Sequence, residues 1–449
     1  MSKHSREITK SFAIKPIQVL PLSFFLLIII GTFFLSLPFA TKVGHLSFID
    51  ALFTSTSAVC VTGLIVVDTA TYFTRWGQII ILILIQLGGL GIMTLSSLFV
   101  LILQGKVSLK NQLFIEESLN QFDIHNLNGF LVSVVFYTLI VETIGGILLF
   151  MGFGNLSGTL LHRVFFSLFH SVSAFCNAGF SVFSNSLMSY QNNLFVNIVV
   201  MALIVLGGIG FFVAFELKNF FFSKQKTILT LHTKVVLSTT LFLIVMGFLL
   251  IALTDIQIFG FSPHKILSYL FLSITARTAG FNTVNIGQLA PATLLVVIIL
   301  MFIGGAPGST AGGVKVTTIA LLYHFLRSKI MKRNDVELYY RRIPHPIIDR
   351  TFLVLILSIL LLFFNLILLG VFQRDIAGHF LHYLFELFSA LGTVGLSMGA
   401  TNNLTLGGKI VIIITMFLGR IGPSTLIIAL AGIDYSHNYK YPEGDISVG

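Results

Sequence analysis

Long hydrophobic stretches alternate with short polar ones along the whole chain. Four apolar runs of about 20 residues or more are long enough to cross about 30 Å of hydrocarbon as helices. They cover residues 18–40, 129–153, 235–255 and 351–373. Four further apolar runs cover 76–103, 194–220, 293–326 and 408–433. Because the sequence lacks the strict alternation of membrane strands, an outer-membrane barrel is disfavoured. The pattern predicts eight membrane-spanning helices.

A shorter apolar segment lies between the two spans of each pair. These segments cover 47–59, 163–175, 265–276 and 379–391. A helix of about 12 residues extends about 18 Å, roughly half of the bilayer. Such a helix has to turn back inside the membrane, and the non-helical chain after it has to line water or be buried in protein. We therefore expect four re-entrant pore helices, each followed by a loop.

The four loops are variations of one motif, in which small or polar residues precede a glycine and then Leu or Phe. The loops cover 60–64, 176–180, 277–281 and 392–396. A second glycine cluster follows each loop, at 88–91, 207–210, 304–308 and 419–423. Three of the short segments also share a Ser-Ala pair before the loop, whereas the third has Ile274-Thr275. This self-similarity predicts four tandem copies of one unit.

The repeats define the expected architecture. They cover 18–104, 105–220, 221–327 and 328–433, between a cytoplasmic N-terminus at 1–17 and a cytoplasmic tail at 434–449. The predicted fold is an all-α integral membrane protein with four span–pore helix–filter–span hairpins. The hairpins are expected in a pseudo-fourfold arrangement around one pore.

Composition and charge agree with a membrane protein. With 55% hydrophobic and 10% charged residues, a water-soluble globular domain is excluded. Most of the 27 lysines and arginines fall at the two ends and in the segments between repeats, which indicates that both termini are cytoplasmic. The net charge of +10 is therefore a topology signal, and no nucleic-acid partner is expected. The first apolar run lacks a small-residue cleavage site and is interpreted as a retained span.

The loop motif is typical of a cation filter. Residues 393–396 read Thr-Val-Gly-Leu, close to the Thr-Val-Gly-Tyr-Gly loops whose carbonyl oxygens replace the hydration shell of K⁺ in potassium channels. Glycine permits the positive φ that such loops require. The predicted ion-binding residues are Cys60, Val61, Thr62, Gly63, Cys176, Asn177, Ala178, Gly179, Thr278, Ala279, Gly280, Thr393, Val394 and Gly395.

The two cysteines and the twelve histidines give no sign of other chemistry. Cys60 and Cys176 each stand three residues before a loop glycine, where we expect small packing side chains and not a disulfide. The histidines show no metal-ligand spacing, so no metal beyond potassium and no cofactor is expected in this chain. A nucleophile with a base, paired catalytic carboxylates and a cofactor motif are also lacking, which excludes an enzyme.

The third ascending span is interrupted by a glycine-rich segment, 304–313. Five glycines and a proline within ten residues prevent a continuous helix. We expect a mobile loop that obstructs the pore below the filter, whereas helix packing explains the glycines of the other three spans. The predicted gate residues are Gly304, Gly305, Gly308, Ser309, Thr310, Gly312, Gly313, Lys315 and Arg420. Arg420 is expected to face the pore and steady the loop; Lys315 either does the same or extends to the cytoplasmic surface.

Two further intramembrane charges need partners. Arg277, beside the third filter loop, is expected to pair with Glu386 or Asp50, and the sequence leaves the choice open. Glu142 lies mid-span in the second repeat, where an interhelical hydrogen bond is favoured over a coupling site.

The motifs resemble those of the membrane subunits of the Trk/Ktr/HKT potassium transporters, most closely the bacterial Ktr type. The resemblance spans essentially the whole chain and rests on 48–53, 61–64, 176–180, 277–282 and 419–423. It implies a homodimer on a cytosolic ring of RCK-type regulatory subunits that bind the nucleotide, and a gating loop at 304–313. Relatives with serine at the first filter glycine tend to admit sodium, so Gly63 favours potassium, and sodium activation is known for some members.

Two functions are thereby distinguished. The first is potassium uptake through a channel-like pore in the bacterial cell membrane, regulated by the cytosolic subunit. The alternative is a sodium- or proton-coupled carrier. Such carriers typically contain inverted repeats, whereas these four copies all run in the same direction. Expected docking surfaces are the basic segment 327–350 and the tail 435–449, with lipid-headgroup binding as an equal explanation for the basic segment.

Overall fold

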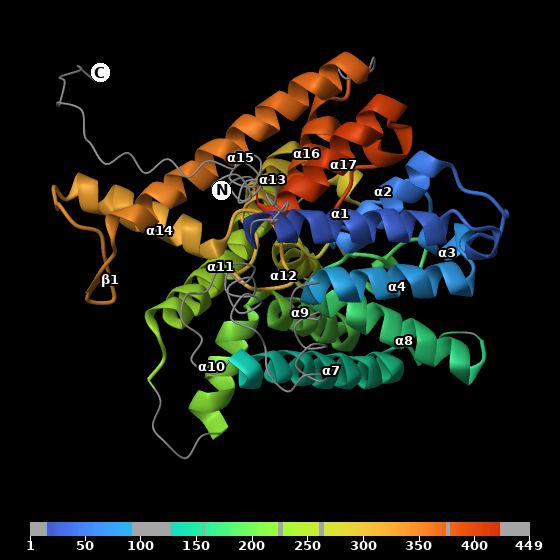
Figure 1. The fold of residues 1–449 in the computed structure, drawn as a ribbon, viewed down its shortest axis with the longest axis horizontal. Helices are drawn as coiled ribbons and strands as arrows, with labels where there is room; N and C mark the ends of the chain where they lie inside the picture. The colour runs from blue at the N-terminus through green and yellow to red at the C-terminus, as the bar shows by residue number, and fades with distance from the viewer. Residues whose placement is uncertain are drawn as a thin grey trace, which may run out of the picture.

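The computed structural model describes residues 16–91, 127–154, 156, 158–222, 228–259, 265–373 and 378–422. The expectations for the N-terminus before residue 16, for the C-terminal tail and for the ascending spans beyond residues 91 and 422 lie outside these ranges. Most of the described chain is helical (Figure 1).

Four long apolar helices match the first spans predicted for the four repeats. They are α1 (Pro16–Leu35), α7 (Leu127–Gly152), α11 (Leu231–Phe259) and α15 (His345–Phe372). In the described part of the chain these are the four single helices with the length and hydropathy to cross a membrane. Their outward side chains, such as Phe33 and Phe363, are about two-thirds exposed, as expected for contact with lipid.

In each ascending segment a helix ends at or just before the glycine cluster. They are α4 (Arg75–Leu90), α9 (Leu194–Gly208) with α10 (Phe211–Phe222), α13 (Pro291–Phe302) with α14 (Val316–Ile330), and α17 (Leu406–Ile421). Gly91, Gly210 and Gly422, next to the helix ends, all have positive φ. The prediction of one continuous span over 194–220 is therefore wrong, because the chain bends by 101° between α9 and α10. Counted as one broken span, this pair is the fifth candidate to cross the membrane.

Four short helices occupy the centre, close to their predicted bounds. They are α2 (Phe48–Val59), α8 (Leu160–Phe175), α12 (Ile266–Thr275) and α16 (Phe380–Gly392). Two begin at side-chain caps, since Ser47 accepts a hydrogen bond from the Asp50 N–H and Thr159 accepts one from the His162 N–H. The last two turns of each helix are largely buried.

The helices pack in a regular order. Each short helix contacts the long helix and the ascending helix of its own repeat. Each ascending helix also contacts the short helix of the next repeat, and the last returns to the first, in the pairs α4–α8, α9–α12, α13–α16 and α17–α2. The four repeats therefore form a closed sequence of neighbours.

The remaining elements are small. Short turns are α3 (Thr69–Tyr72), η1 (Pro38–Ala40), η2 (Met188–Tyr190), η4 (Ile286–Gln288) and η5 (Ala400–Asn403). Between α14 and α15 the basic segment forms an antiparallel hairpin of β1 (Glu337–Leu338) and β2 (Arg341–Arg342), which projects away from the helices in Figure 1. The sequence reading did not anticipate this hairpin.

Candidate functional site

The four loop glycines meet at the centre of the molecule. A Cβ placed on Gly63 would lie 3.1 Å from the Cα of Gly179, and one on Gly179 would lie 3.0 Å from the Cα of Gly280. A Cβ on Gly280 would lie 3.2 Å from the Cα of Gly395, and one on Gly395 would lie 2.9 Å from the Cα of Gly63. The glycines are thus neighbours in cyclic order, with no room for a side chain between them.

All four loops share one backbone conformation. The residue two positions before each glycine has a positive φ, which is 57° at Val61, 58° at Asn177, 75° at Thr278 and 49° at Thr393. The glycines have φ of 89°, 69°, 76° and 91°, whereas the residue between has a negative φ. A non-glycine residue with positive φ costs about 1–3 kcal/mol, so the surroundings must hold this conformation.

A hydroxyl residue near the end of each short helix holds the loop. These residues are Ser57, Ser173, Thr275 and Ser389. The backbone carbonyl of each accepts a hydrogen bond of 2.8–2.9 Å from the N–H of the residue before the loop glycine.

The hydroxyl groups add a second bond. Those of Ser57 and Ser389 accept from the glycine N–H at 3.0 Å, and those of Ser173 and Thr275 donate to the carbonyl after the glycine at 2.7 Å. The sequence showed the serine in three copies but not its role. In the third copy Thr275 takes that role, one residue later than serine does elsewhere.

The residues expected to bind the ion are buried with the loops. The hydroxyl oxygens of Thr62, Thr278 and Thr393 have no hydrogen-bond partner among the described residues. Cys60 and Cys176 are buried free thiols. The Cys176 thiol lies 3.8 Å from Glu142 Oε1 and 3.7 Å from Gln86 Oε1, so Glu142 makes the interhelical contact expected of it.

The interrupted part of the third ascending span forms a closed loop directly against the four glycine loops. Ile303 and Val314 form a parallel bridge, and the Gly304 N–H donates to the Val314 carbonyl at 2.8 Å. The two ends of the loop therefore lie side by side. A Cβ on Gly312 would collide with the Thr393 side chain. The Thr310 hydroxyl donates to the Phe175 carbonyl at 3.1 Å, at the base of the second glycine loop.

Two cations fix this loop. Arg420 donates through Nη1 to the Thr310 carbonyl and through Nη2 to the Gly88 carbonyl at 2.5 Å. The Lys315 Nζ donates to the carbonyls of Ala311 at 2.8 Å and Gly312 at 3.3 Å. Lys315 therefore turns back to the loop instead of extending to the cytoplasmic surface.

The expected ion pair of Arg277 is wrong. Asp50 pairs with Lys409 at 2.5 Å, and Glu386 accepts hydrogen bonds from the hydroxyl groups of Ser397 and Thr401. Arg277 is 8% exposed and donates through Nη1 to the Thr240 carbonyl at 3.4 Å. Because each acid has another partner, the position of an acid in the repeat pattern did not predict its pairing.

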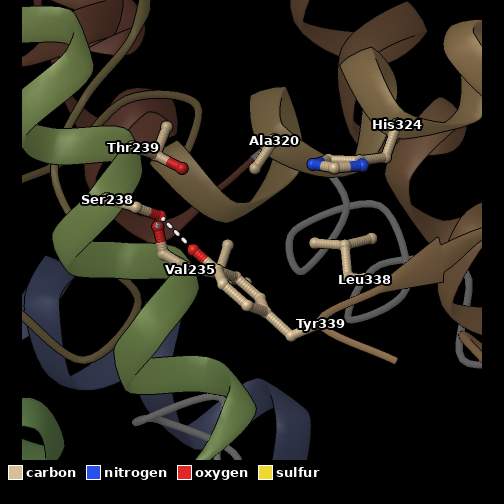
Figure 2. Close-up of a pocket in the computed structure, with 7 residues that line it drawn as sticks. All are labelled: Val235, Ser238, Thr239, Ala320, His324, Leu338 and Tyr339. Carbon is tan, nitrogen blue, oxygen red and sulfur yellow. Dashed lines mark hydrogen bonds between the residues drawn. The ribbon is translucent and has the colours of Figure 1, made fainter. Parts of the chain in front are cut away.

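A cavity of about 160 Å³ lies away from the glycine loops, between α11, α14 and the β1–β2 hairpin (Figure 2). Figure 2 shows the Tyr339 hydroxyl reaching Ser238, a hydrogen bond of 3.1 Å. This contact ties the hairpin to α11.

The long apolar helices and the buried short helices whose loops meet between them define a multi-pass membrane protein. The model of the TrkH family, described as a cation transport protein, matches residues 14–439. The chain belongs to this family.

Relatives match along the whole chain. The chain is 39% identical over 460 residues to the Ktr system potassium uptake protein B of Bacillus subtilis, with 100% of both chains covered. It is 36% identical over 444 residues to the potassium/sodium uptake protein NtpJ of Enterococcus hirae, covering 97% of this chain and 98% of that protein. These relatives are transporters and not enzymes.

A solved structure shows the same fold. The crystal structure of the potassium transporter TrkH from Vibrio parahaemolyticus matches with a TM-score of 0.73 and 20% sequence identity. The match covers 96% of this chain and 86% of that chain.

Proposed function

We propose that this chain carries potassium into the cell through a channel-like pore whose selectivity filter is the ring of four loops. The observation that carries the proposal is the cyclic contact of Gly63, Gly179, Gly280 and Gly395, with the same pair of positive-φ positions in every loop. The names of the relatives, a potassium uptake protein and a potassium/sodium uptake protein, agree with this substrate.

The filter acts by replacing water around the ion. A bare cation in hydrocarbon costs tens of kcal/mol by simple solvation arguments, and convergent carbonyl oxygens offset that cost. The carbonyls of Thr62, Ala178, Ala279 and Val394 lie next to the glycine of the neighbouring loop, so they are the best candidates for one ring of ligands. Thr62, Thr278 and Thr393, whose hydroxyl oxygens have no hydrogen-bond partner among the described residues, lie in the same loops. Potassium is the substrate, and the chain itself needs no cofactor.

The loop at 304–313 is the gate in this account. Arg420, Lys315 and Thr310 hold it against the filter loops. The loop has to leave this position before ions pass at full rate. Arg420 adds an electrostatic barrier: at roughly 10 Å and an effective dielectric of about 20, a unit positive charge costs a permeating cation about 1.7 kcal/mol.

Regulation is assigned to a second protein. The chain is proposed to form a homodimer that docks on a cytosolic ring of RCK-type subunits, which bind the nucleotide. The basic segment 327–350 is the docking surface within the described residues, because its hairpin presents the fully exposed Tyr340 beside Arg341. The tail at 435–449 lies outside the described residues.

The orientation follows from the charges. Both termini and the hairpin are placed in the cytoplasm of a bacterial cell, because the lysines and arginines concentrate in those segments. Eight spans and four re-entrant hairpins then surround one pore with pseudo-fourfold symmetry. The closed sequence of helix contacts supports that arrangement.

A sodium- or proton-coupled carrier is the second candidate. One relative is a potassium/sodium uptake protein, and Glu142 is a buried acid close to the second filter loop. Sodium activation of potassium uptake would be compatible with either function.

Reconstitution tests the proposal. Liposomes that contain the purified chain are loaded with potassium and supplied with radioactive rubidium outside. They should accumulate rubidium, driven by the outward potassium gradient, without sodium or a proton gradient. Uptake that requires either gradient would favour the coupled carrier, and no monovalent cation movement at all would refute both.

A further inference from the structure

The buried guanidinium of Arg277 has an unmet hydrogen-bonding group and a charge without a described counterion. Its Nε has no hydrogen-bond partner among the described residues, and the single contact of Nη1 to Thr240 is long. The two acids expected to neutralise it pair elsewhere. An uncompensated buried charge costs several kcal/mol, so a compensating group is expected.

A small cavity lies beside this guanidinium. Its volume is about 20 Å³, enough for one water molecule or one ion of similar size. Arg277 and Thr240 supply its polar side chains, and Gly208, Gly305 and apolar side chains from α9 and α12 complete the wall. None of these lining residues is acidic. The Thr240 hydroxyl also has no hydrogen-bond partner among the described residues.

We propose that this cavity is a binding site for one small monovalent anion, such as chloride, held by the Arg277 guanidinium and the Thr240 hydroxyl. Both groups can donate a hydrogen bond. The Gly208 carbonyl, which would repel an anion, already accepts from the Ala306 N–H at 2.9 Å. A water molecule would satisfy the donors but would leave the buried positive charge uncompensated, which is why an anion is favoured.

The site also contacts the gate proposed above. Gly305, the second residue of the loop, forms part of the cavity wall. A bound anion would neutralise Arg277 beside the third filter loop and pack against the closed loop. This consequence depends on the proposed function, whereas anion binding itself does not.

Bromide provides a direct probe. The full chain crystallised in potassium bromide should show an anomalous difference peak between the Arg277 guanidinium and the Thr240 hydroxyl. A water molecule in the cavity, or an empty cavity, in well-ordered bromide crystals would overturn the proposal. This result does not depend on transport, so it separates failure of the anion site from failure of the proposed function.

Variants give the matched controls. Thr240→Val keeps the shape of the side chain and leaves the Arg277 guanidinium in place, but it removes the hydroxyl donor. Bromide occupancy should therefore fall. Arg277→Gln should abolish the peak, and a peak that persists would overturn the proposal. Thr254→Val, on the same helix but bonded to Thr293, should leave the peak unchanged.

A solution measurement covers variants that resist crystallisation. Replacing gluconate by chloride should raise the melting temperature of the unmodified chain and of Thr254→Val. The same exchange should raise it less for Thr240→Val. Equal stabilisation of all three proteins would contradict a site at Thr240.

Discussion

Single residues determine how closely the four loops approach one another. Each loop glycine adopts a positive φ and faces the backbone of the next loop, so it satisfies two requirements that no other residue meets. The hydroxyl residues at the helix ends hold the strained positions, and Arg420 and Lys315 bind the carbonyls of the loop at 304–313.

Replacing Gly63 tests the first of these roles. A Cβ there would collide with the Ala178 carbonyl oxygen. In Gly63→Ser the ring must therefore widen, and the ratio of potassium to sodium permeability should fall by about tenfold, or about 1.4 kcal/mol. Bi-ionic flux in liposomes measures the ratio.

A matched control separates ring distortion from backbone strain. Gly399 has a similar φ of 92°, but a Cβ there would meet nothing within 4 Å. Gly399→Ser should keep the selectivity of the unmodified chain. Equal loss of selectivity in both variants would contradict the ring account.

Arg420 offers a test of the electrostatic barrier. Arg420→Gln removes the charge and weakens the contact with Thr310, so rubidium uptake should rise, by about ten- to twentyfold if the charge acts at roughly 10 Å. Lys329→Gln removes a cation near the end of α14 and should not change uptake. Lower uptake in Arg420→Gln would mean that the residue supports the pore instead of restricting it.

Thr275 tests the support of the third loop. Thr275→Val keeps the shape of the side chain but leaves the buried Phe281 carbonyl without its 2.7 Å hydrogen bond. The free energy of unfolding should decrease by about 1–3 kcal/mol. Thermal unfolding in detergent measures the change, and an unaltered melting temperature would show that the bond contributes little.

At the scale of elements, the sequence predicted helices better than their breaks. Length and hydropathy located α1, α7, α11 and α15. The four short helices were located as shorter apolar segments between the two spans of each repeat. The break at Gly210 was missed, because glycines that pack against a neighbour and glycines that end a helix look alike in a sequence. The β1–β2 hairpin was missed because its strands have two residues each and Tyr339 and Tyr340 occupy its positive-φ turn.

Deleting residues 305–312 tests the gate. The Gly304 N–H bonds the Val314 carbonyl, so the ends of the loop already meet and a short connection can close without moving α13 or α14. Rubidium uptake should increase, because the segment packed against Thr393 is gone. Unchanged uptake in a correctly folded variant would remove this loop as the gate.

Charge reversal on the hairpin tests docking. Arg341→Glu together with Tyr340→Ala alters two exposed side chains on the β1–β2 hairpin, which projects away from the helices (Figure 1). Basal uptake should stay the same, whereas stimulation by the cytosolic partner should be lost. Lys42→Glu, the same charge change in a loop assigned to the opposite face, should retain stimulation. Retained stimulation in the hairpin variant would place docking elsewhere.

At the scale of the whole molecule, the sequence predicted four similar units in a ring, but not the residue pairs that join one unit to another. Similar glycine motifs identified four units, and the contacts now show that each ascending helix meets the short helix of the next unit. Partners such as Asp50 with Lys409 join the first repeat to the last, more than 300 residues apart in the chain. Nothing local in the sequence predicts such a pair, because it depends on how the closed sequence of repeats comes together.

The most direct test of the central claim is to locate a permeant ion. In crystals of the full chain grown in rubidium chloride, the anomalous signal of rubidium should lie among the carbonyl oxygens of Thr62, Ala178, Ala279 and Val394. Rubidium bound elsewhere, with none among these four loops while the protein still transports it, would contradict the account.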